Sequence, residues 1–299
     1  MLKSRLLIGS PLALLLGLAI FWPGQPGALI FTGLAGAGIF AAFSEYSRIA
    51  DSLGFAGPHK LLKYIGVVLV LAIVYSPLIK VEETASQPVI VWPAELVLLT
   101  IAVLICCLYV IRAENYATAL NCAAVALAGL VLVYGSLNFG VKLFFNAGLK
   151  SEGRFLLFFV AGATKASDMG AYAAGTFTSR LPGGNHKIMP HISPKKSWEG
   201  LIGGILASIL TALVIYLSLG ESLQFCGKTV LCLGSAIIYG AMFGLLGFCG
   251  DITESALKRA ARFDDSGALP GLGGVLDITD SLLFVLPVFY GFVAGQVMF

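Results

Sequence analysis

Residues 89–110, VIVWPAELVLLTIAVLICCLYV, form an apolar run with a single charged side chain, Glu95. As an α-helix, a run of this length crosses the roughly 30 Å of hydrocarbon in a bilayer. It does not alternate between apolar and polar residues, as a strand of a transmembrane β-barrel must. The run therefore predicts a membrane-spanning helix.

Similar apolar runs recur along the 299-residue chain, which is 58% hydrophobic and 12% charged. Soluble domains carry about 25% charged residues, so this composition excludes a soluble enzyme. We predict an all-α polytopic membrane protein with one transmembrane domain over residues 1–299. Windows of about 20 residues give a bundle of about nine transmembrane helices, approximately at 4–22, 27–44, 61–79, 90–111, 117–137, 155–175, 200–219, 229–249 and 281–298. Residues 138–147 are too short to span and are expected to lie along the interface.

Basic residues lie mostly in short loops on one side of the predicted helices. Because such loops tend to stay in the cytoplasm, we predict a cytoplasmic N-terminus and a multi-pass protein of the cell's inner (cytoplasmic) membrane. Loops 176–199 and 250–280 are separated by two predicted spans, so both are expected at the cytoplasmic face. Three basic residues count against this orientation: Lys142, Lys150 and Arg154.

Polar residues are unevenly distributed between the two halves of the chain. Residues 1–150 are predicted to be a generic helix bundle, whereas residues 151–299 contain nearly every polar cluster and are predicted to be the catalytic half. The net charge of +3 is too small to indicate nucleic-acid binding. The six cysteines lack metal-ligand spacing and are interpreted as buried thiols.

Residues 250–280 concentrate six carboxylates and three basic side chains between two apolar runs. Charges beside hydrocarbon are costly unless something binds them, which favours a functional site. If the helix before Gly250 continues, Asp251, Glu254 and Lys258 share one helical face. Asp277, before the last helix, can then converge with Asp251 on one hard cation such as Mg²⁺, which typically uses one or two protein carboxylates plus substrate phosphates. An ordinary acidic turn is the alternative.

A glycine-rich turn, Pro270-Gly271-Leu272-Gly273-Gly274, lies inside this segment. Glycines let backbone N–H groups approach phosphate oxygens closely. The turn therefore predicts contact with a phosphate group.

Two further clusters precede this segment. Lys165 lies one helical turn before Asp168 near the cytoplasmic end of the sixth predicted span, where an ionisable pair suggests function; a local helix–helix ion pair is the alternative. The basic loop 186–200 contains Lys195 and Lys196, which suit phosphate oxygens, and Ser193 is expected to order its turn. The same loop would also anchor to anionic lipid headgroups.

Together these segments resemble the phosphatidate cytidylyltransferase (CDP-diacylglycerol synthase) family. The resemblance covers roughly the C-terminal half and is carried by four motifs: Asp168-x-Gly170-Ala171-Tyr172, Ser193-Pro194-Lys195-Lys196-Ser197-Trp198-Glu199-Gly200, Gly250-Asp251-x-x-Glu254-Ser255-x-x-Lys258-Arg259, and Pro270-Gly271-x-Gly273-Gly274-x-x-Asp277-x-x-Asp280-Ser281. It implies transfer of CMP from CTP to phosphatidate at the lipid bilayer, with release of pyrophosphate, in phospholipid biosynthesis. It also implies Mg²⁺, and it leaves a second cation and a homodimer open.

The resemblance and the residue pattern together assign roles. The family's two metal-binding aspartates correspond to Asp251 and Asp277, and Lys258 and Ser255 complete the expected catalytic set. The expected substrate-binding residues are Lys165, Asp168, Lys187, Ser193, Lys195, Lys196, Glu254, Arg259, Asp265, Gly273, Gly274 and Asp280.

Four positions depart from the family's usual signature. Asp264 stands in place of a lysine, Leu272 in place of a histidine and Ile278 in place of an arginine; Lys165 stands where a tryptophan is common. A catalytically weak paralogue is therefore an alternative. A CTP-dependent lipid-alcohol kinase or a CDP-archaeol-type synthase, which would use the same aspartates and Mg²⁺ with a different acceptor, is another. A transporter is the non-enzyme alternative, but it predicts charges near the middle of spans rather than at their cytoplasmic ends.

Overall fold

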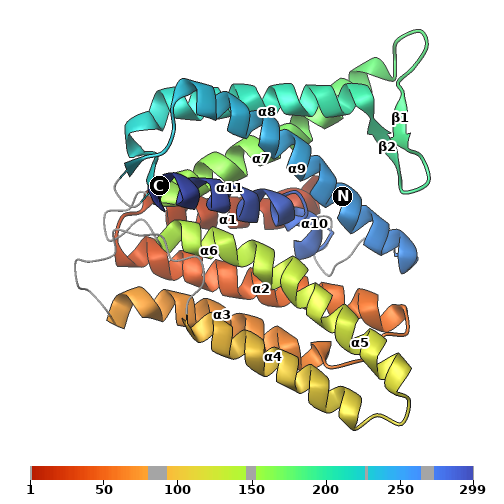
Figure 1. Cartoon of the computed structure of the whole chain (residues 1–299). Helices are drawn as coiled ribbons and strands as arrows, with labels where there is room; N and C mark the ends of the chain where they lie inside the picture. Colours follow the sequence, from red (N-terminus) through yellow and green to blue (C-terminus); the bar gives the residue numbers. More distant parts are fainter. Residues whose placement is uncertain (1, 80–92, 146–152, 226–227, 264–272, 299) are drawn as a thin grey trace. The chain divides into compact units, whose positions relative to one another are not determined.

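The computed structural model describes residues 2–79, 93–145, 153–225, 228–263 and 273–298. The described chain is mainly helical (Figure 1). Its described residues divide into two compact units, one made of residues 2–79, 93–145, 260–263 and 273–278 and the other of residues 153–225, 228–259 and 279–298. The prediction of a single domain stays a prediction, since a compact unit need not fold independently.

The first unit is built from long helices of the N-terminal half and from most of a short helix near the C-terminus. They are α1 (Leu2–Phe21), α2 (Gln25–Ser52), α3 (His59–Ile79), α4 (Pro93–Ile111), α5 (Tyr116–Gly129), α6 (Ser136–Phe145) and α10 (Val275–Thr279). Local signals set several helix starts. Pro26 occupies the first turn of α2, where its missing N–H costs little. The side chain of Asn115 caps α5 by accepting a hydrogen bond from Thr118 N at 3.1 Å.

Helices α5 and α6 are joined by a π-helical turn, Leu130–Gly135. The result is one helical stretch, Tyr116–Phe145. The prediction that residues 138–147 lie along the interface is therefore wrong for residues 138–145, which continue this helical stretch. Residues 146 and 147 lie outside the described residues. The polar side chains that ended the apolar run in the sequence, Asn138 and Lys142, are buried instead.

Both side chains contact Glu95 on α4. Lys142 Nζ lies 2.7 Å from Glu95 Oε2, and the two side chains are 2% and 3% exposed. Asn138 and Tyr134 donate to the other carboxylate oxygen at 2.5 and 3.2 Å. A buried, paired lysine is not a loop cation, so Lys142 does not count against the predicted orientation.

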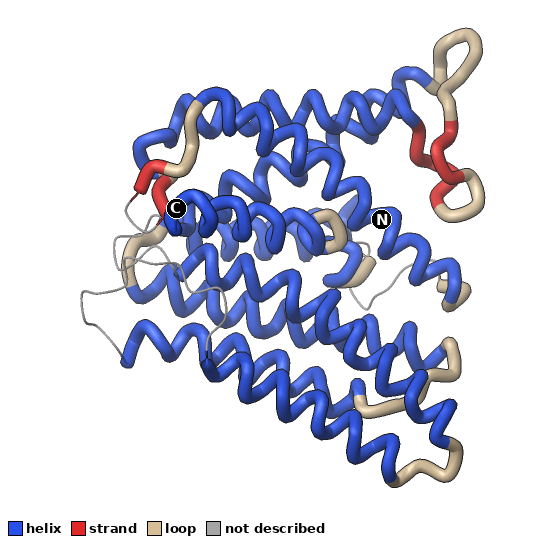
Figure 2. The backbone as a smooth tube through the Cα atoms, viewed as in Figure 1, coloured by secondary structure: helices blue, strands red, loops and turns tan. Residues whose placement is uncertain are grey.

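The second unit contains the remaining helices and two short antiparallel hairpins, which Figure 2 shows in red. Its elements are α7 (Gly153–Thr178), β1 (Lys187–Met189), β2 (Ser193–Ser197), α8 (Trp198–Leu219), β3 (Gln224–Phe225), β4 (Lys228–Thr229), α9 (Leu233–Ala260) and α11 (Leu282–Met298). The β1–β2 hairpin lies within the predicted loop 176–199, and β4 occupies the predicted start of the eighth span.

Helix α9 continues through Gly250 to Ala260, as the helical spacing of its acidic residues required. At Gly250 the helix passes directly against the main chain of Asp280. A Cβ atom on Gly250 would overlap the carbonyl oxygen of Asp280. The glycine therefore permits the close approach that brings Asp251 near Asp280.

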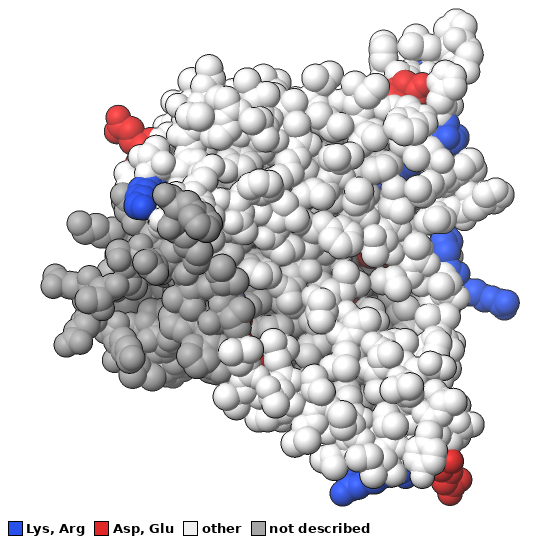
Figure 3. All heavy atoms as spheres, in the orientation of Figure 1, with Lys and Arg blue, Asp and Glu red and all other residues white. Residues whose placement is uncertain are grey.

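Among the described residues, four helical stretches are long and apolar enough to cross a membrane: Gln25–Ser52, Tyr116–Phe145, Trp198–Ser222 and Leu233–Ala260. Shorter apolar helices cover 9–21, 95–111 and 282–297. Few charged side chains are visible on the face shown in Figure 3. The chain is thus an all-α type of membrane protein, while the count of about nine spans stays a prediction.

Candidate active site

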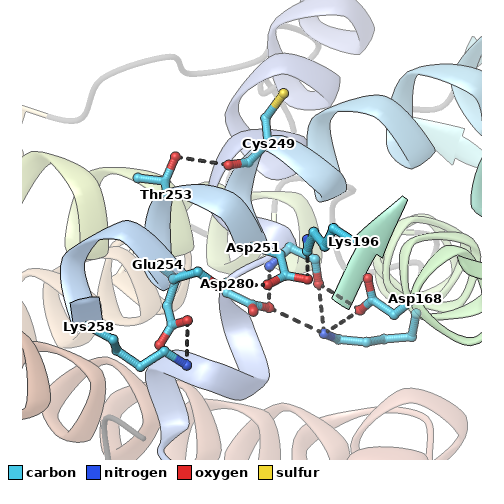
Figure 4. Close-up of polar contacts among 11 residues, drawn as sticks. Asp168, Lys196, Cys249, Asp251, Thr253, Glu254, Lys258 and Asp280 are labelled. Carbon is cyan, nitrogen blue, oxygen red and sulfur yellow. Dashed lines mark hydrogen bonds and ion pairs between the residues drawn. The ribbon is translucent and has the colours of Figure 1, made fainter. Parts of the chain in front are cut away.

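Three carboxylates of the second unit form a cluster (Figure 4). Asp251 and Glu254 lie one turn apart on α9, and Asp280 lies in the turn before α11. One carboxylate oxygen from each lies within 4.8 Å of those of the other two. Oxygen donors this close are the ligand set that hard divalent cations prefer.

Each α9 carboxylate also has a lysine partner. Lys196 Nζ lies 2.5 Å from Asp251 Oδ2 and 4.6 Å from the centre of the Phe248 ring. Lys258 Nζ lies 2.7 Å from Glu254 Oε2, one helical turn along α9. The cluster therefore combines acidic groups for a cation with basic groups for phosphate oxygens.

The β1–β2 hairpin positions Lys196. Ser197 caps α8 by accepting a hydrogen bond from Gly200 N at 3.1 Å. Glu199 accepts hydrogen bonds from the backbone N–H of His186, the shorter at 3.1 Å, and lies 2.6 Å from its Nδ1 atom. These contacts fasten both ends of the hairpin to the first turn of α8.

Lys165 on α7 joins a second polar network. Its Nζ atom donates to Asp168 Oδ2 at 3.1 Å and to Ser281 Oγ at 2.7 Å, and lies 3.8 Å from Asp280 Oδ1. The Ser281 hydroxyl contacts Asp168 Oδ2 at 3.1 Å. The local Lys165–Asp168 ion pair therefore exists, and the same ammonium group also faces the carboxylate cluster.

The electrostatics of this network are concentrated on Asp280. The pKa of Asp280 is raised to about 7. Burial is the largest cause and the charges of Asp251 and Asp168 add to it, while Lys165 and the backbone N–H of Ser281 oppose it. Near neutral pH the proton and a bound cation would therefore compete for this carboxylate.

The other predicted residues of the second unit are Ser255, Ser193, Lys187, Lys195 and Arg259. The Ser255 hydroxyl donates to Asp251 Oδ1 at 3.5 Å. Ser193 in β2 is partly exposed. Three basic residues of this set are exposed: Lys187, Lys195 and Arg259. The contacts described for the cluster are therefore made by Lys196 rather than by Lys187 or Lys195.

Three predicted residues belong to the first unit. Gly273 has a φ angle of +82°, a left-handed conformation that glycine adopts without strain. Gly274 N donates to Asp277 Oδ2 at 2.8 Å. Asp277 and Asp251 belong to different units, so their sharing of one cation stays a prediction. Asp265 lies outside the described residues, as do Asp264 and Leu272.

Sequence reasoning missed two residues that contact these segments. Ser281 ends the last motif of the sequence, and its hydroxyl bridges Lys165 and Asp168. Glu45, in the half predicted to be generic, accepts hydrogen bonds from the backbone of Val275 and Leu276. The available signal for Glu45 was a carboxylate directly after the predicted span 27–44, where a charge beside hydrocarbon is costly unless something binds it.

The fold and the cluster define a helical membrane protein with an acidic site flanked by lysines. The chain belongs to the cytidylyltransferase family, whose sequence pattern it matches over residues 3–295.

Individual relatives match over shorter regions. The uncharacterized protein YnbB of Escherichia coli is 38% identical over 142 residues, which is 47% of this chain and 43% of that protein. The phosphatidate cytidylyltransferase of Chlamydia muridarum is 37% identical over 134 residues, covering 44% and 41% of the two chains. The phosphatidate cytidylyltransferase of Staphylococcus saprophyticus is 34% identical over 149 residues, covering 50% and 52%. The chain thus spans about half the length of the curated relatives it matches.

Proposed function

We propose that this protein transfers CMP from CTP to phosphatidate, giving CDP-diacylglycerol and pyrophosphate. The observation that carries the proposal is the Asp251, Glu254 and Asp280 cluster, with Lys196 and Lys165 beside it. Membership of the cytidylyltransferase family and two relatives named phosphatidate cytidylyltransferase support it.

The donor set fits Mg²⁺. Three carboxylates with oxygens within 4.8 Å of one another offer hard ligands and leave room for substrate phosphates and water. When bound, Mg²⁺ neutralises charge on the phosphates and on the departing pyrophosphate. Asp251 and Asp277 are the two ligands that the family resemblance assigns; Asp280 and Glu254 are added because they face Asp251.

The reaction needs positioning and charge neutralisation more than acid–base chemistry. The phosphate of phosphatidate is largely dianionic at pH 7, so one of its oxygens attacks the α-phosphorus of CTP without a general base. The bond from that phosphorus to the bridging oxygen breaks, and pyrophosphate leaves with the electron pair. Lys196, Lys258 and Arg259 would neutralise phosphate oxygens, while Ser193 and Ser255 would donate hydrogen bonds to them.

We further propose that the chain crosses the inner membrane about nine times, with its N-terminus and the site facing the cytoplasm. The excess of basic residues in one set of loops supports this orientation. The burial of Lys142 against Glu95 removes one of the three residues that opposed it. Phosphatidate would then enter sideways from the bilayer, and CTP from the cytoplasm.

The test follows two labels on CTP. Protein purified in detergent is given Mg²⁺, phosphatidate and CTP labelled at either the α- or the γ-phosphate. Cytidylyl transfer moves the α-label into lipid and the γ-label into pyrophosphate. A lipid-alcohol kinase would instead move the γ-label into a lipid alcohol, and an archaeol-type synthase would prefer an ether-lipid acceptor. With Asp251→Asn as the blank, the absence of α-label from lipid, or the appearance of γ-label in lipid, would contradict the proposal.

A further inference from the structure

Glu45 on α2 contacts the segment that contains Asp277, within the first unit. Its side chain is 4% exposed. One carboxylate oxygen accepts a hydrogen bond from Val275 N at 2.9 Å, and the other accepts one from Leu276 N at 2.8 Å. The two donors are the residues immediately before Asp277, and they begin helix α10.

A buried carboxylate is costly unless its oxygens are hydrogen-bonded. Here both oxygens are used, and hydrogen bonds to an ionised acceptor are roughly twice as strong as neutral ones. Arg48 Nη2 lies 4.0 Å from Glu45 Oε1. The Arg48 side chain is 54% exposed, so water screens the attraction between the two charges. The backbone N–H groups are therefore substantial partners of Glu45.

The same segment also contacts the carboxylate of Asp277. Gly273 turns the chain with a positive φ angle, and Gly274 N donates to Asp277 Oδ2 at 2.8 Å. Leu276 is fully buried, which anchors the start of α10 in the first unit. The Asp277 carboxylate is thus bound by the glycine turn, and the backbone just before Asp277 is bound by Glu45.

We propose that Glu45 is the positioning residue for Asp277, which it orients through the backbone of Val275 and Leu276 without touching the substrate. This rests on the proposed function, in which Asp277 is a cation ligand. Loss of the contact would let the start of α10 turn and move the Asp277 carboxylate. Residues that orient metal ligands typically contribute 10–100-fold to metal affinity.

The informative change is Glu45→Gln, because it keeps the shape of the side chain. The carboxamide has one oxygen, so one of the two N–H groups would face an NH₂ group instead of an acceptor. Glu45→Asp keeps the charge but shortens the reach, and it serves as the second variant. Glu95→Gln is the matched control: Glu95 is also buried and in the same unit, and its described partners are Lys142, Asn138 and Tyr134.

The measurement is Mn²⁺ binding, followed by electron paramagnetic resonance on protein in detergent without CTP. Hydrogen exchange of the Val275 and Leu276 amides reports the contact itself. We expect Glu45→Gln to weaken Mn²⁺ binding at least tenfold and to speed exchange at one or both amides, with a smaller loss in Glu45→Asp. Glu95→Gln should lower the melting temperature and leave Mn²⁺ affinity unchanged.

Asp277→Asn distinguishes the positioning role of Glu45 from the role of Asp277 as a cation ligand. If it weakens Mn²⁺ binding while Glu45→Gln and Glu45→Asp do not, the positioning role is overturned and the cation ligand stands. An equal loss of affinity in Glu95→Gln would overturn it as well, because general destabilisation would explain the effect. Unchanged Mn²⁺ affinity in Asp277→Asn would overturn the cation ligand, and the positioning role with it, while the label assay would still test cytidylyl transfer independently.

Discussion

The ammonium group of Lys196 lies 2.5 Å from Asp251 Oδ2, linking the β1–β2 hairpin to α9 within the second unit. The lysine also lies over the ring of Phe248, so its partners are the aspartate and an aromatic face. A divalent cation bound by Asp251 would compete with this ammonium group. Lys196 would then be released toward the phosphates that arrive with the cation.

The first prediction follows from that competition. Lys196→Met should lower kcat/KM for CTP about 100-fold, a loss of roughly 2.7 kcal/mol in transition-state stabilisation. It should not weaken Mn²⁺ binding measured without CTP, because Asp251 loses a competitor. The control Arg180→Met removes an exposed positive charge elsewhere in the second unit. Equal losses in both variants would point to a general charge effect.

Asp251→Asn is expected to reduce cytidylyl transfer by several orders of magnitude, since cation binding and positioning supply most of the catalysis. Asp277→Asn should have a comparable effect. Both proteins should remain folded, as judged by their elution from size-exclusion chromatography. Near-normal turnover in the two variants would reject these aspartates as cation ligands.

Asp280 gives a prediction on stability and pH. Its pKa is raised to about 7 in the folded protein, against about 3.9 for an unfolded aspartate. The folded state therefore binds the proton more tightly, and the contribution of this group to stability falls as the pH rises from about 4 through 7. The asparagine in Asp280→Asn cannot ionise. In EDTA, the melting temperature of this variant should therefore rise relative to that of the wild type as the pH increases from 5 to 8.

At pH 8, Mg²⁺ should raise the melting temperature of the wild type above that of Asp280→Asn. It stabilises the wild type by binding the ionised cluster, whereas the variant offers one carboxylate fewer. A melting-temperature difference that does not change with pH in EDTA would contradict the raised pKa.

Local regularities predicted much of the second unit. The i, i+3 and i+7 spacing of Asp251, Glu254 and Lys258 depends only on helical geometry, and α9 indeed continues through them. The hairpin was not predicted, because its strands are very short and contain or adjoin prolines, which are not typical of strands.

Contacts between distant residues could not be predicted from any local period. Glu45 and Val275 are 230 positions apart, and Lys165 and Ser281 are 116 apart. The pairing of Lys142 with Glu95 likewise depends on tertiary packing. Without it, a lysine after an apolar run is indistinguishable from a loop cation.

Sidedness can be checked with single cysteines in a background without the six native ones. Ser179→Cys precedes the hairpin, and Glu221→Cys lies at the other end of the α8 stretch Trp198–Ser222. An impermeant thiol reagent supplied from the cytoplasmic side should label only Ser179→Cys, by the bias of basic loops. Labelling of only Glu221→Cys from that side would invert the proposed orientation.

The last prediction concerns Lys165, whose ammonium group lies 2.7 Å from Ser281 Oγ and 3.8 Å from Asp280 Oδ1. The family resemblance places a tryptophan here and a basic residue at Ile278, so Lys165 would replace part of the missing positive charge. Lys165→Trp should raise the KM for CTP at least tenfold, about 1.4 kcal/mol. Adding Asp264→Lys and Ile278→Arg should recover most of that loss.

Ser281→Ala separates the effect of the Lys165 charge from the effect of the hydrogen-bond network. It removes the hydroxyl that contacts Lys165 and Asp168 but keeps both charges. We expect it to lower the melting temperature with little change in the KM for CTP. If Lys165→Trp behaves in the same way, with an unchanged KM and a lower melting temperature, then Lys165 stabilises the helices of the second unit. A raised KM in Lys165→Trp alone would assign its charge to the nucleotide.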